Sequence, residues 1–501
     1  MIARKSTLIL LGNATDALLA YVALFFISRY MGPNEYGIIG FAMSFVGLFS
    51  FLGSLGFNQA HVKKMSEGKD PGVRIGSFMT IKLILTVIMS IATIGAVVFW
   101  KYVLNRGFES STHETAIFII LFYYIFEKIS DIFLQTFIAD TYIAKKIIPH
   151  FIDTIIRTSA IIYVALAGYG AIALALSYVL GHFFLFLVSL LFFRGYPIKK
   201  PTKLCIKEYN EFAWPCLIVT VASMFISNFD KVLIQLFWSS TEVGYYFASF
   251  RVSGLIVLIG SSVGMVMFPT ISNYFIKNKE EDIKNILSLS ERYISLYTIP
   301  CVIGVIALAK PAIPILLSNS FIPAYYIWCI LPVYSILYAL FIPCESYFLG
   351  VGKPYTARNR MLVMVTINIL LNILLVPKSL FGVRLFGLGA VGSAIALVLS
   401  YGSALIFYKV MIWRCLKITM NKRIILHLFA GVIMGAVLYY LSTIVLIERF
   451  YHLLIFGLAG LGIYFGILYL LKEFTCNDLN VLIETLNVKK MYNYIKDEIK
   501  K

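Results

Sequence analysis

The chain has 501 residues, of which 60% are hydrophobic and only 14% are charged, so it has too little polar surface to cover a water-soluble globule. The net charge of +18 does not indicate a nucleic-acid-binding protein, because the basic residues form short clusters between apolar runs rather than one soluble face. The composition predicts a membrane protein whose basic clusters meet anionic lipid headgroups.

Membrane-spanning helices need about 20 mostly apolar residues, and the sequence contains fourteen such stretches. The first follows Arg4 and Lys5 and is expected to remain uncleaved, because polar residues interrupt its apolar run and no convincing cleavage site follows. We therefore predict an all-α polytopic membrane protein with about fourteen transmembrane helices. The stretches lie at 7–29, 37–60, 77–100, 115–140, 148–168, 171–193, 211–237, 243–267, 290–309, 325–349, 359–376, 388–410, 424–446 and 451–471.

The distribution of lysine and arginine predicts the orientation, because these residues are retained on the cytoplasmic side. With the N-terminus placed inside, the inner segments hold 30 of the 43 basic residues, the outer segments hold 7, and 6 lie within spans. A miscounted pair of helices would have removed this bias. The pattern predicts a multi-pass protein of the cell (plasma) membrane with cytoplasmic N- and C-termini.

Two parts of the chain repeat each other. At an offset of 207 residues, Glu35 and Gly37 fall on Glu242 and Gly244. At an offset of 219, GYGA at 168–171 matches GLGA at 387–390. Each copy holds six predicted spans, an even number, so the copies should share one orientation, as in transporters built from parallel repeats. Two such lobes are expected to enclose a central cavity.

The repeat predicts five parts of the chain. A basic connector containing Pro197 and Pro201 is expected to link the lobes. Apolar residues alternate with polar ones in the C-terminal tail, which fits an amphipathic helix on the inner leaflet. The parts are an N-terminal lobe at 1–193, a cytoplasmic linker at 194–210, a C-terminal lobe at 211–415, two further spans at 416–471 and the amphipathic cytoplasmic tail at 472–501.

Short motifs spread over nearly the whole chain resemble one group of transporters. They are RYMGPNEYG at 29–37, NFDKVLIQ at 228–235, EVGYY at 242–246, FP at 268–269, GVGKP at 350–354, NILLNILLVP at 368–377 and GLGAVGSAIA at 387–396. With them the chain resembles the polysaccharide transporter branch of the multidrug/oligosaccharidyl-lipid/polysaccharide (MOP) exporter superfamily, which includes O-antigen and lipid-linked oligosaccharide flippases and has a MATE-like fold.

The resemblance implies a flippase, not an enzyme. Such a protein moves a polyprenyl-phosphate or polyprenyl-diphosphate glycan from the cytoplasmic to the outer leaflet by alternating access, for cell-surface polysaccharide or glycan assembly. The expected partners are the lipid-linked oligosaccharide and membrane lipids, without nucleic acid, and the chain is expected to be a monomer.

Arg251 is the intramembrane cation that most needs an explanation. It lies about two turns inside an apolar helix, where a charge costs roughly 2.5 to 3.5 kcal/mol, and the first copy of the repeat has Ser44 at this position. We interpret Arg251 either as a contact of the substrate headgroup or as half of an interhelical salt bridge, with Asp16 as a possible partner. Flippases that this chain resembles use an arginine on the eighth span and carry further arginines on the first two spans. Here the first span has Asp16, and the second has no basic residue before His61.

Three more cations within spans are candidates for headgroup contacts: Lys128, Arg157 and Lys82. Arg157 follows Asp153 by four residues and can pair with it on one helical face. Lys128 precedes Asp131 by three residues and can meet it in the same way. Lys82 lies near the cytoplasmic end of its span and can extend to the interface. Each cation therefore has a structural interpretation beside substrate binding.

Acidic and amide residues within spans suggest a coupling site. Asp16, with Asn13 on the same helical face, is the best acid for a coupling Na⁺ or H⁺, although it could instead pair helices. Asp230 is expected to hold helices together. Its neighbour Lys231 is about 100° away around the helix, so we expect it to reach the outer interface rather than Asp230. The seven cysteines show no metal-ligand spacing, and we expect no metal and no cofactor.

Two rival functions can be compared with these features. A membrane glycosyltransferase would need catalytic carboxylates on an outer loop, and the longest one, 101–114, offers only Glu109 and Glu114. A cation-coupled multidrug exporter of the same superfamily is the alternative, but its cavity should be net acidic, and the deep spans show no clear acidic excess. His182 is expected to be a buried hydrogen-bonding residue, and Arg292 a lipid-facing anchor.

Overall fold

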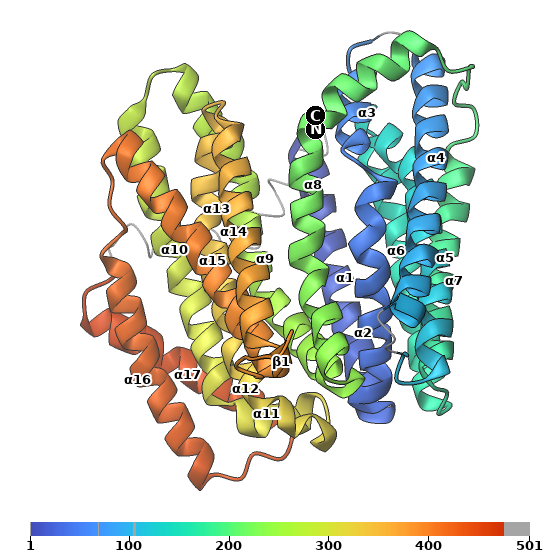
Figure 1. The fold of residues 1–501 in the computed structure, drawn as a ribbon. Coiled ribbons are helices and arrows are strands. Elements are labelled where there is room, and N and C mark those ends of the chain that lie inside the picture. Colours follow the sequence, from blue (N-terminus) through green and yellow to red (C-terminus); the bar gives the residue numbers. More distant parts are fainter. Residues whose placement is uncertain (1, 69, 104–106, 475–501) are drawn as a thin grey trace. The chain divides into compact units, whose positions relative to one another are not determined.

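The computed structural model describes residues 2–68, 70–103 and 107–474, and nearly all of them are helical (Figure 1). One short hairpin, β1 (Ser379–Leu380) and β2 (Val383–Arg384), pairs antiparallel. The helices are α1 (Ile2–Tyr30), α2 (Gly32–Phe49), α3 (Phe57–Met65), α4 (Pro71–Val98), α5 (Ser111–Ala139), α6 (Ile143–Leu166), α7 (Ala171–Phe192), α8 (Lys203–Phe237), α9 (Ser240–Ile276), α10 (Glu280–Ala307), α11 (Ala309–Leu316), α12 (Tyr325–Ile330), α13 (Pro332–Gly350), α14 (Pro354–Leu375), α15 (Gly389–Leu416), α16 (Arg423–Ile444) and α17 (Phe450–Leu470).

The predicted helical membrane architecture is confirmed. Within the described ranges, 11 helices are long and apolar enough to cross a membrane. Helices α1, α5 and α9 have 29, 29 and 37 residues and are of spanning length as well. The number fourteen stays a prediction, and the predicted tail at 472–501 lies almost entirely outside the described residues.

Two predicted spans are broken. The stretch 37–60 is not one helix, because α2 ends at Phe49, a 3-10 turn covers Ser50–Gly53 and α3 begins only at Phe57. Between them Leu55 (φ 40°) and Gly56 (φ 81°) adopt left-handed conformations that an α-helix cannot contain. The stretch 325–349 is divided between α12 and α13, whose first residue is Pro332.

The chain forms two compact units. Among the described residues, unit 2 comprises Leu8–Phe247 and Ile369–Ser393, and unit 1 comprises Ala248–Asn368 and residues 394–474, together with residues 2–7. This division describes compactness and not membrane topology, so the predicted lobes at 1–193 and 211–415 stay a prediction.

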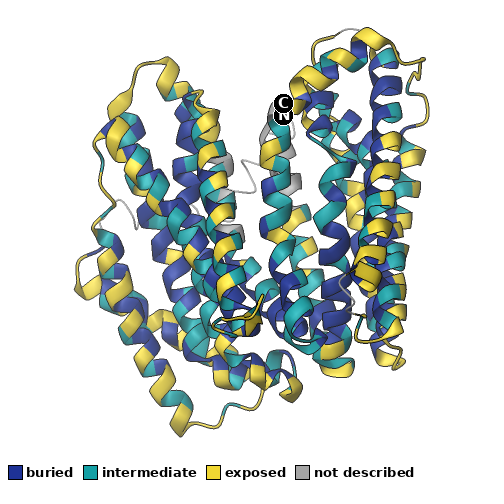
Figure 2. Cartoon of the chain, in the orientation of Figure 1, coloured by how far each residue is buried: buried dark blue, intermediate teal, exposed yellow. Residues whose placement is uncertain are grey.

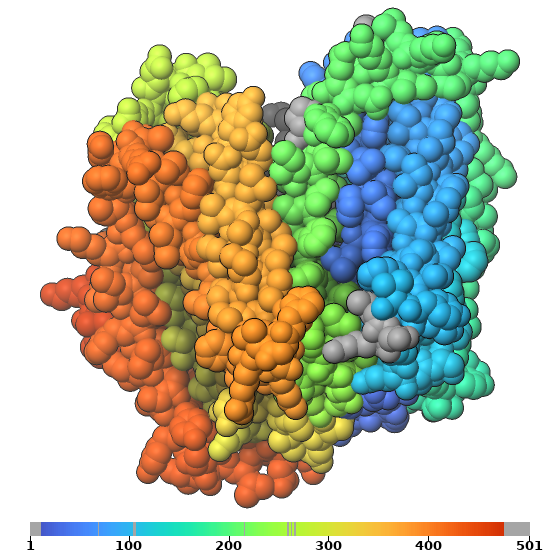
Figure 3. Space-filling view, in the orientation of Figure 1, coloured from blue at the N-terminus to red at the C-terminus, as the bar shows by residue number. Residues whose placement is uncertain are grey.

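Within each unit the helices bury their apolar faces against one another. Figure 2 shows buried residues on the helix faces that meet, and exposed ones on outward faces and connections. Side chains fill the spaces between neighbouring ribbons of a unit, as the space-filling view makes plain (Figure 3). In unit 2, one core joins α3, α4, α5, α7 and α8 and contains Phe57, Ile75, Phe78, Ile81, Leu85, Ile132, Phe133, Phe137, Leu185, Phe193 and Tyr209.

The two copies of the predicted repeat touch through glycines at equivalent positions. A Cβ atom added to Gly37 would lie 1.7 Å from the carbonyl oxygen of Ser240. Reciprocally, a Cβ atom added to Gly244 would lie 1.9 Å from the carbonyl oxygen of Pro33. Ser240 follows Pro33 by the same offset of 207 that relates the glycines. The start of α2 and the start of α9 therefore meet backbone to backbone.

Two glutamates at equivalent positions bind the beginnings of equivalent helices. Glu35 accepts a hydrogen bond from the backbone N–H of Ala171, at the start of α7. Glu242 accepts a backbone hydrogen bond from Ala390, at the start of α15. A carboxylate is favourable there because the N-terminal end of a helix carries partial positive charge. The offsets of 207 and 219 thus correspond to one repeated arrangement of contacts.

A buried histidine joins α3, α5 and α8. The Nε2 atom of His61 lies 2.9 Å from Thr136 Oγ1, and its Nδ1 atom lies 2.8 Å from Tyr209 Oη. The Thr136 hydroxyl donates to the Ile132 carbonyl, so it accepts from His61. The Tyr209 hydroxyl lies between Nδ1 of His61 at 2.8 Å and the Arg74 carbonyl at 3.3 Å. The ring stacks on Phe78 with centroids 4.0 Å apart. Burial in these surroundings favours the neutral imidazole.

This arrangement predicts acid sensitivity of unit 2. Burial, together with the nearby Arg74 guanidinium, lowers the pKa of His61 from 6.5 to about 3. The unfolded chain then binds more protons than the folded chain between these two values, so the stabilisation is complete above pH 6.5 and is lost as the pH falls toward 3. Thermal unfolding in detergent between about pH 7.5 and about pH 4.5 should show a loss of up to about 1.4 kcal/mol per pH unit. His61→Gln should flatten the profile; an unchanged slope in that variant would contradict the assignment.

In unit 1, a carboxylate holds α10, α16 and the end of α17 together. Glu473 is 1% exposed and its Oε1 atom lies 2.6 Å from Arg292 Nε. Arg423 donates to the Glu473 carbonyl at 2.8 Å, and His427 Nε2 lies 3.4 Å from Oε1. The expectation that Arg292 anchors the helix in lipid is wrong, because its side chain is buried against Glu473, which lies 181 residues away in the sequence.

Candidate functional site

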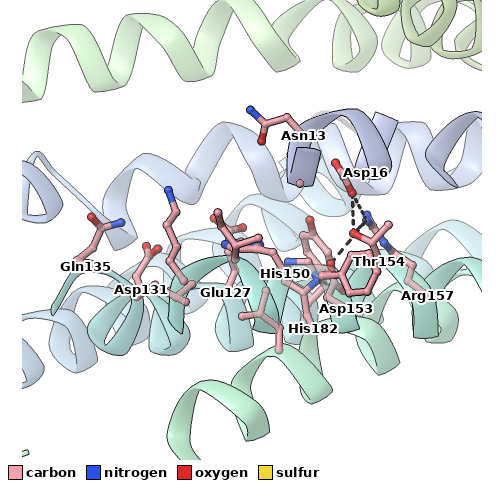
Figure 4. Close-up of a pocket in the computed structure, with 17 residues that line it drawn as sticks. Asn13, Asp16, Glu127, Asp131, Gln135, His150, Asp153, Thr154, Arg157 and His182 are labelled. Atoms are coloured by element: carbon pink, nitrogen blue, oxygen red, sulfur yellow. Dashed lines mark hydrogen bonds and ion pairs between the residues drawn. The ribbon is translucent and has the colours of Figure 1, made fainter. Parts of the chain in front are cut away.

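A polar cavity of about 510 Å³ lies inside unit 2 (Figure 4). Four helices form it: α1 contributes two candidates from the sequence, and α5, α6 and α7 contribute charged and aromatic side chains. A hollow of this polarity is unusual within apolar helices, which makes it the candidate functional site. Its lining is Gly12, Asn13, Asp16, Tyr123, Glu127, Asp131, Leu134, Gln135, Lys146, Ile147, His150, Phe151, Asp153, Thr154, Arg157, His182 and Leu185.

One end of the cavity is held by a network between α1 and α6. Thr154 Oγ1 donates to Asp16 Oδ1 at 2.6 Å, and Arg157 Nη2 donates to the same oxygen at 3.2 Å. Figure 4 shows Asp16 pointing from α1 toward Thr154 and Arg157. Arg157 also lies 3.6 Å from Asp153 Oδ2, so the predicted i,i+4 pair forms. Asp16, considered above as a partner for Arg251, thus pairs with Arg157.

His182 and Asn13 both line the cavity. His182 is buried and its Nδ1 atom lies 3.1 Å from Asp153 Oδ1, as expected for a hydrogen-bonding histidine. Its ring centroid lies 3.9 Å from that of Tyr123. Asn13 is exposed and lines the cavity one turn before Asp16.

Lys82 binds the break between α2 and α3. Its side chain is fully buried, and its Nζ atom donates to Gly53 O at 2.9 Å, to Asn58 Oδ1 at 3.2 Å and to Asp131 Oδ2 at 3.0 Å. The ammonium therefore satisfies a carbonyl that the interrupted helix leaves without an intrahelical donor. Lys82 does not extend to the interface as expected, because the half-buried carboxylate of Asp131 lies within its reach.

Lys128 and Asp131 do not pair as expected. Lys128 Nζ lies 2.9 Å from Glu127 Oε1 and 5.8 Å from the centroid of the Tyr124 ring. Asp131 instead accepts a hydrogen bond from Lys82, which is 49 positions away in the sequence. The i,i+3 spacing allows Lys128 to pair with Asp131, but Asp131 pairs with a lysine of another helix instead.

The expectation that Lys231 could not meet Asp230 is also wrong. Lys231 Nζ lies 2.9 Å from Asp230 Oδ1 and also donates to the Ser227 carbonyl. A long lysine side chain can curl back over the 100° that separate neighbouring positions. The other oxygen of Asp230 accepts from the Tyr246 hydroxyl, so the carboxylate links α8 to α9. Arg251 lies farther along α9 and is half-buried; its role in headgroup binding stays a prediction.

A second polar cavity adjoins the first. It measures about 520 Å³, shares Gln135 with the first cavity and is lined by Asn58, Gln59, Val62, Lys63, Ser66 and Gln135. Within the part of the chain that the structure describes, no group of three or more His, Cys, Asp or Glu side chains could hold a metal ion.

Sequence reasoning missed Lys146, His150 and Gln135. A signal existed for the first two, since residues four apart at the start of an apolar helix share one face. Gln135 has no such signal, because an amide within a helix can face any neighbour.

Comparisons with known proteins agree with this architecture. A family model described as "Polysaccharide biosynthesis protein" matches residues 26–325. The "Probable low-salt glycan biosynthesis flippase Agl15" of Haloferax volcanii is 22% identical over 471 residues, which are 93% of this chain and 94% of that protein. The "Probable flippase AglR" of the same organism is 27% identical over 207 residues, 38% of either chain.

Two solved structures share the fold. The lipid II flippase MurJ, in an inward closed conformation, aligns with a TM-score of 0.76 and 16% identity over 92% of this chain and 98% of that one. An inward-facing multidrug resistance MATE family transporter of the MOP superfamily aligns with a TM-score of 0.62 and 15% identity over 80% and 95%.

Proposed function

The chain belongs to the polysaccharide biosynthesis protein family, and from this premise we propose that it is a flippase for a lipid-linked oligosaccharide. It moves a polyprenyl-phosphate or polyprenyl-diphosphate glycan from the cytoplasmic to the outer leaflet of the cell membrane by alternating access. In this proposal it acts as a monomer with cytoplasmic termini, and as a transporter rather than an enzyme.

The observation that carries the proposal is the match to a glycan biosynthesis flippase along 93% of the chain. The polar cavity of unit 2 supports it. A lipid-linked glycan has a polar head and an apolar tail, so its carrier needs charged and hydrogen-bonding groups inside an apolar bundle.

The proposed source of energy is the membrane potential. A diphosphate that leaves an inside-negative cell gains about 2.3 kcal/mol per charge for each 100 mV. A coupling Na⁺ or H⁺ would add to this, with Asp16 as the proposed acid. One of its oxygens accepts from Thr154 and Arg157, and its side chain is 56% exposed.

The alternative is a cation-coupled multidrug exporter, because MATE transporters share the fold. An organic cation needs carboxylates that are free to neutralise it. All four carboxylates of the cavity lining, however, are bound by cations of the same unit: Asp16 and Asp153 by Arg157, Asp131 by Lys82, and Glu127 by Lys128. This arrangement favours the glycan substrate.

The proposal can be tested in proteoliposomes with a fluorescent polyprenyl-diphosphate oligosaccharide and a membrane-impermeant quencher. The wild-type protein should make the inner-leaflet probe accessible, whereas ethidium should not be transported. Arg251→Ala should slow translocation about tenfold or more, the effect of losing one charge-assisted hydrogen bond. Transport of ethidium without the glycan lipid would favour the drug exporter instead.

A further inference from the structure

Two basic side chains at the beginning of α6 face the cavity of unit 2. Lys146 and His150 are four residues apart and therefore lie on one face of the helix. Both belong to the lining of the 510 Å³ cavity. His150 is exposed, so its ring nitrogens can reach a bound molecule.

Lys146 differs from the other cations of this site. Arg157, Lys82 and Lys128 each hold a carboxylate of the lining, and those contacts occupy their charge. Over the residues that the structure places, Lys146 makes no ion pair. It is thus the cation of the lining whose charge is available to an anion.

The neighbouring lysine provides a contrast. Lys145 Nζ lies 5.7, 5.0 and 5.5 Å from the ring centroids of Phe137, Tyr142 and Tyr196. Aromatic faces attract an ammonium group, and adjacent residues of a helix point about 100° apart. Lys145 therefore packs against aromatic rings, while Lys146 lines the cavity.

The place of Lys146 along α6 also suits an anion. It lies in the first turn of the helix, where the backbone carries partial positive charge. Asp153 and Arg157 follow it by seven and eleven residues, which correspond to about 10 and 16 Å along the helix axis. An anion at Lys146 is thereby about 10 Å from Asp153 along the helix axis. His150 precedes Asp153 by three residues and interacts electrostatically with Asp153 and Asp131, so the anion lies toward the Lys146 end of the site.

We propose that Lys146 and His150 bind the phosphate or diphosphate group of the substrate. This inference rests on the proposed function and adds the residues and the end of the cavity that recognise the headgroup. Lys146 supplies an ammonium charge with three donors, and His150 supplies a ring N–H. The predicted topology puts the beginning of α6 on the cytoplasmic side, where a lipid-linked glycan would enter.

The test compares Lys146→Gln with Lys145→Gln, two adjacent variants with the same change of charge. In the proteoliposome assay, K146Q should raise the substrate concentration for half-maximal translocation about tenfold or more, as expected for one charge-assisted hydrogen bond. K145Q should stay within about twofold of wild type, and Lys146→Arg should retain most of the function. Equal behaviour of K146Q and K145Q in this assay would overturn the inference.

Competition with inorganic pyrophosphate distinguishes a site that binds free diphosphate from one that binds diphosphate only as part of the lipid. If it competes with the lipid in the wild type but not in K146Q, the diphosphate alone is recognised here. If it does not compete while K146Q still loses affinity for the lipid, the group is recognised only as part of the lipid-linked substrate. Both results support the inference.

The proposed function and this inference can fail separately. A wild-type protein that translocates no glycan lipid would refute the function, and pyrophosphate protection against thermal unfolding in wild type and K146Q would still test the site. A shift of the unfolding temperature that is equal in both proteins would refute the phosphate site. His150→Asn should weaken translocation less than K146Q does, because a neutral ring contributes a hydrogen bond without a full charge.

Discussion

Lys82→Met is expected to destabilise the protein by about 3 to 5 kcal/mol, because it leaves the Asp131 carboxylate inside unit 2 without its ammonium partner. Lys82 is fully buried and donates to three oxygens, one of which is the carbonyl of Gly53 at the break between α2 and α3. Methionine fills a similar volume but donates no hydrogen bond. The loss is therefore electrostatic rather than a loss of packing.

A double-mutant cycle measures this interaction. Asp131→Asn alone should also be destabilising, because it leaves the ammonium uncompensated, whereas K82M combined with D131N should cost less than the sum of the two single changes. Thermal unfolding in detergent gives the values. Lys101→Gln is the control: its pair with Glu114 is 42% and 34% exposed, so its loss should barely change the unfolding temperature. Additive effects of K82M and D131N would contradict the pairing.

Gly37→Ala is the second change expected to have a severe effect. A methyl group at this position would lie 1.7 Å from the carbonyl oxygen of Ser240, and one at Gly244 would lie 1.9 Å from that of Pro33. The obstacles are backbone atoms, which cannot rotate away as a side chain can, so the starts of α2 and α9 must separate. Either variant should lower stability by several kcal/mol, on the order of 3 or more, or prevent folding.

The control for the glycine variants is Gly95→Ala in α4. Apart from the local backbone of α4, no atom lies within 4 Å of a Cβ added there, and alanine has the better helix propensity by about 1 kcal/mol. G95A should therefore be neutral or slightly stabilising. If G37A unfolded at the same temperature as G95A, the close contact would be wrong. Expression level together with size-exclusion profiles would identify variants that fail to fold.

Hydropathy predicted the helical membrane fold, because the burial of apolar residues in lipid imposes a minimum length on each span. It did not predict the break between α2 and α3, since Leu55 and Gly56 interrupt an apolar run without changing its composition. The repeat was visible because its contacts use glycine and glutamate, residues that stand out in apolar helices.

The charged site was predictable only where partners are close in sequence. The Asp153 and Arg157 pair followed from its spacing. The partners of Lys82 and Arg292 are 49 and 181 residues away, and no helical spacing indicates them. The error at Lys231 arose from treating the direction of the Cα–Cβ bond as the direction of a long, flexible side chain.

The reciprocal glycine contact has a consequence for the origin of the chain. Position 37 of the first copy meets Ser240, which is equivalent to Pro33, while position 244 of the second copy meets Pro33 itself. Such exchange of equivalent partners defines an isologous interface, the kind that identical subunits form in a symmetric homodimer. An ancestor with a single copy would already have carried both halves of this self-complementary surface. Gene duplication and fusion would convert such an association between subunits into an intramolecular contact.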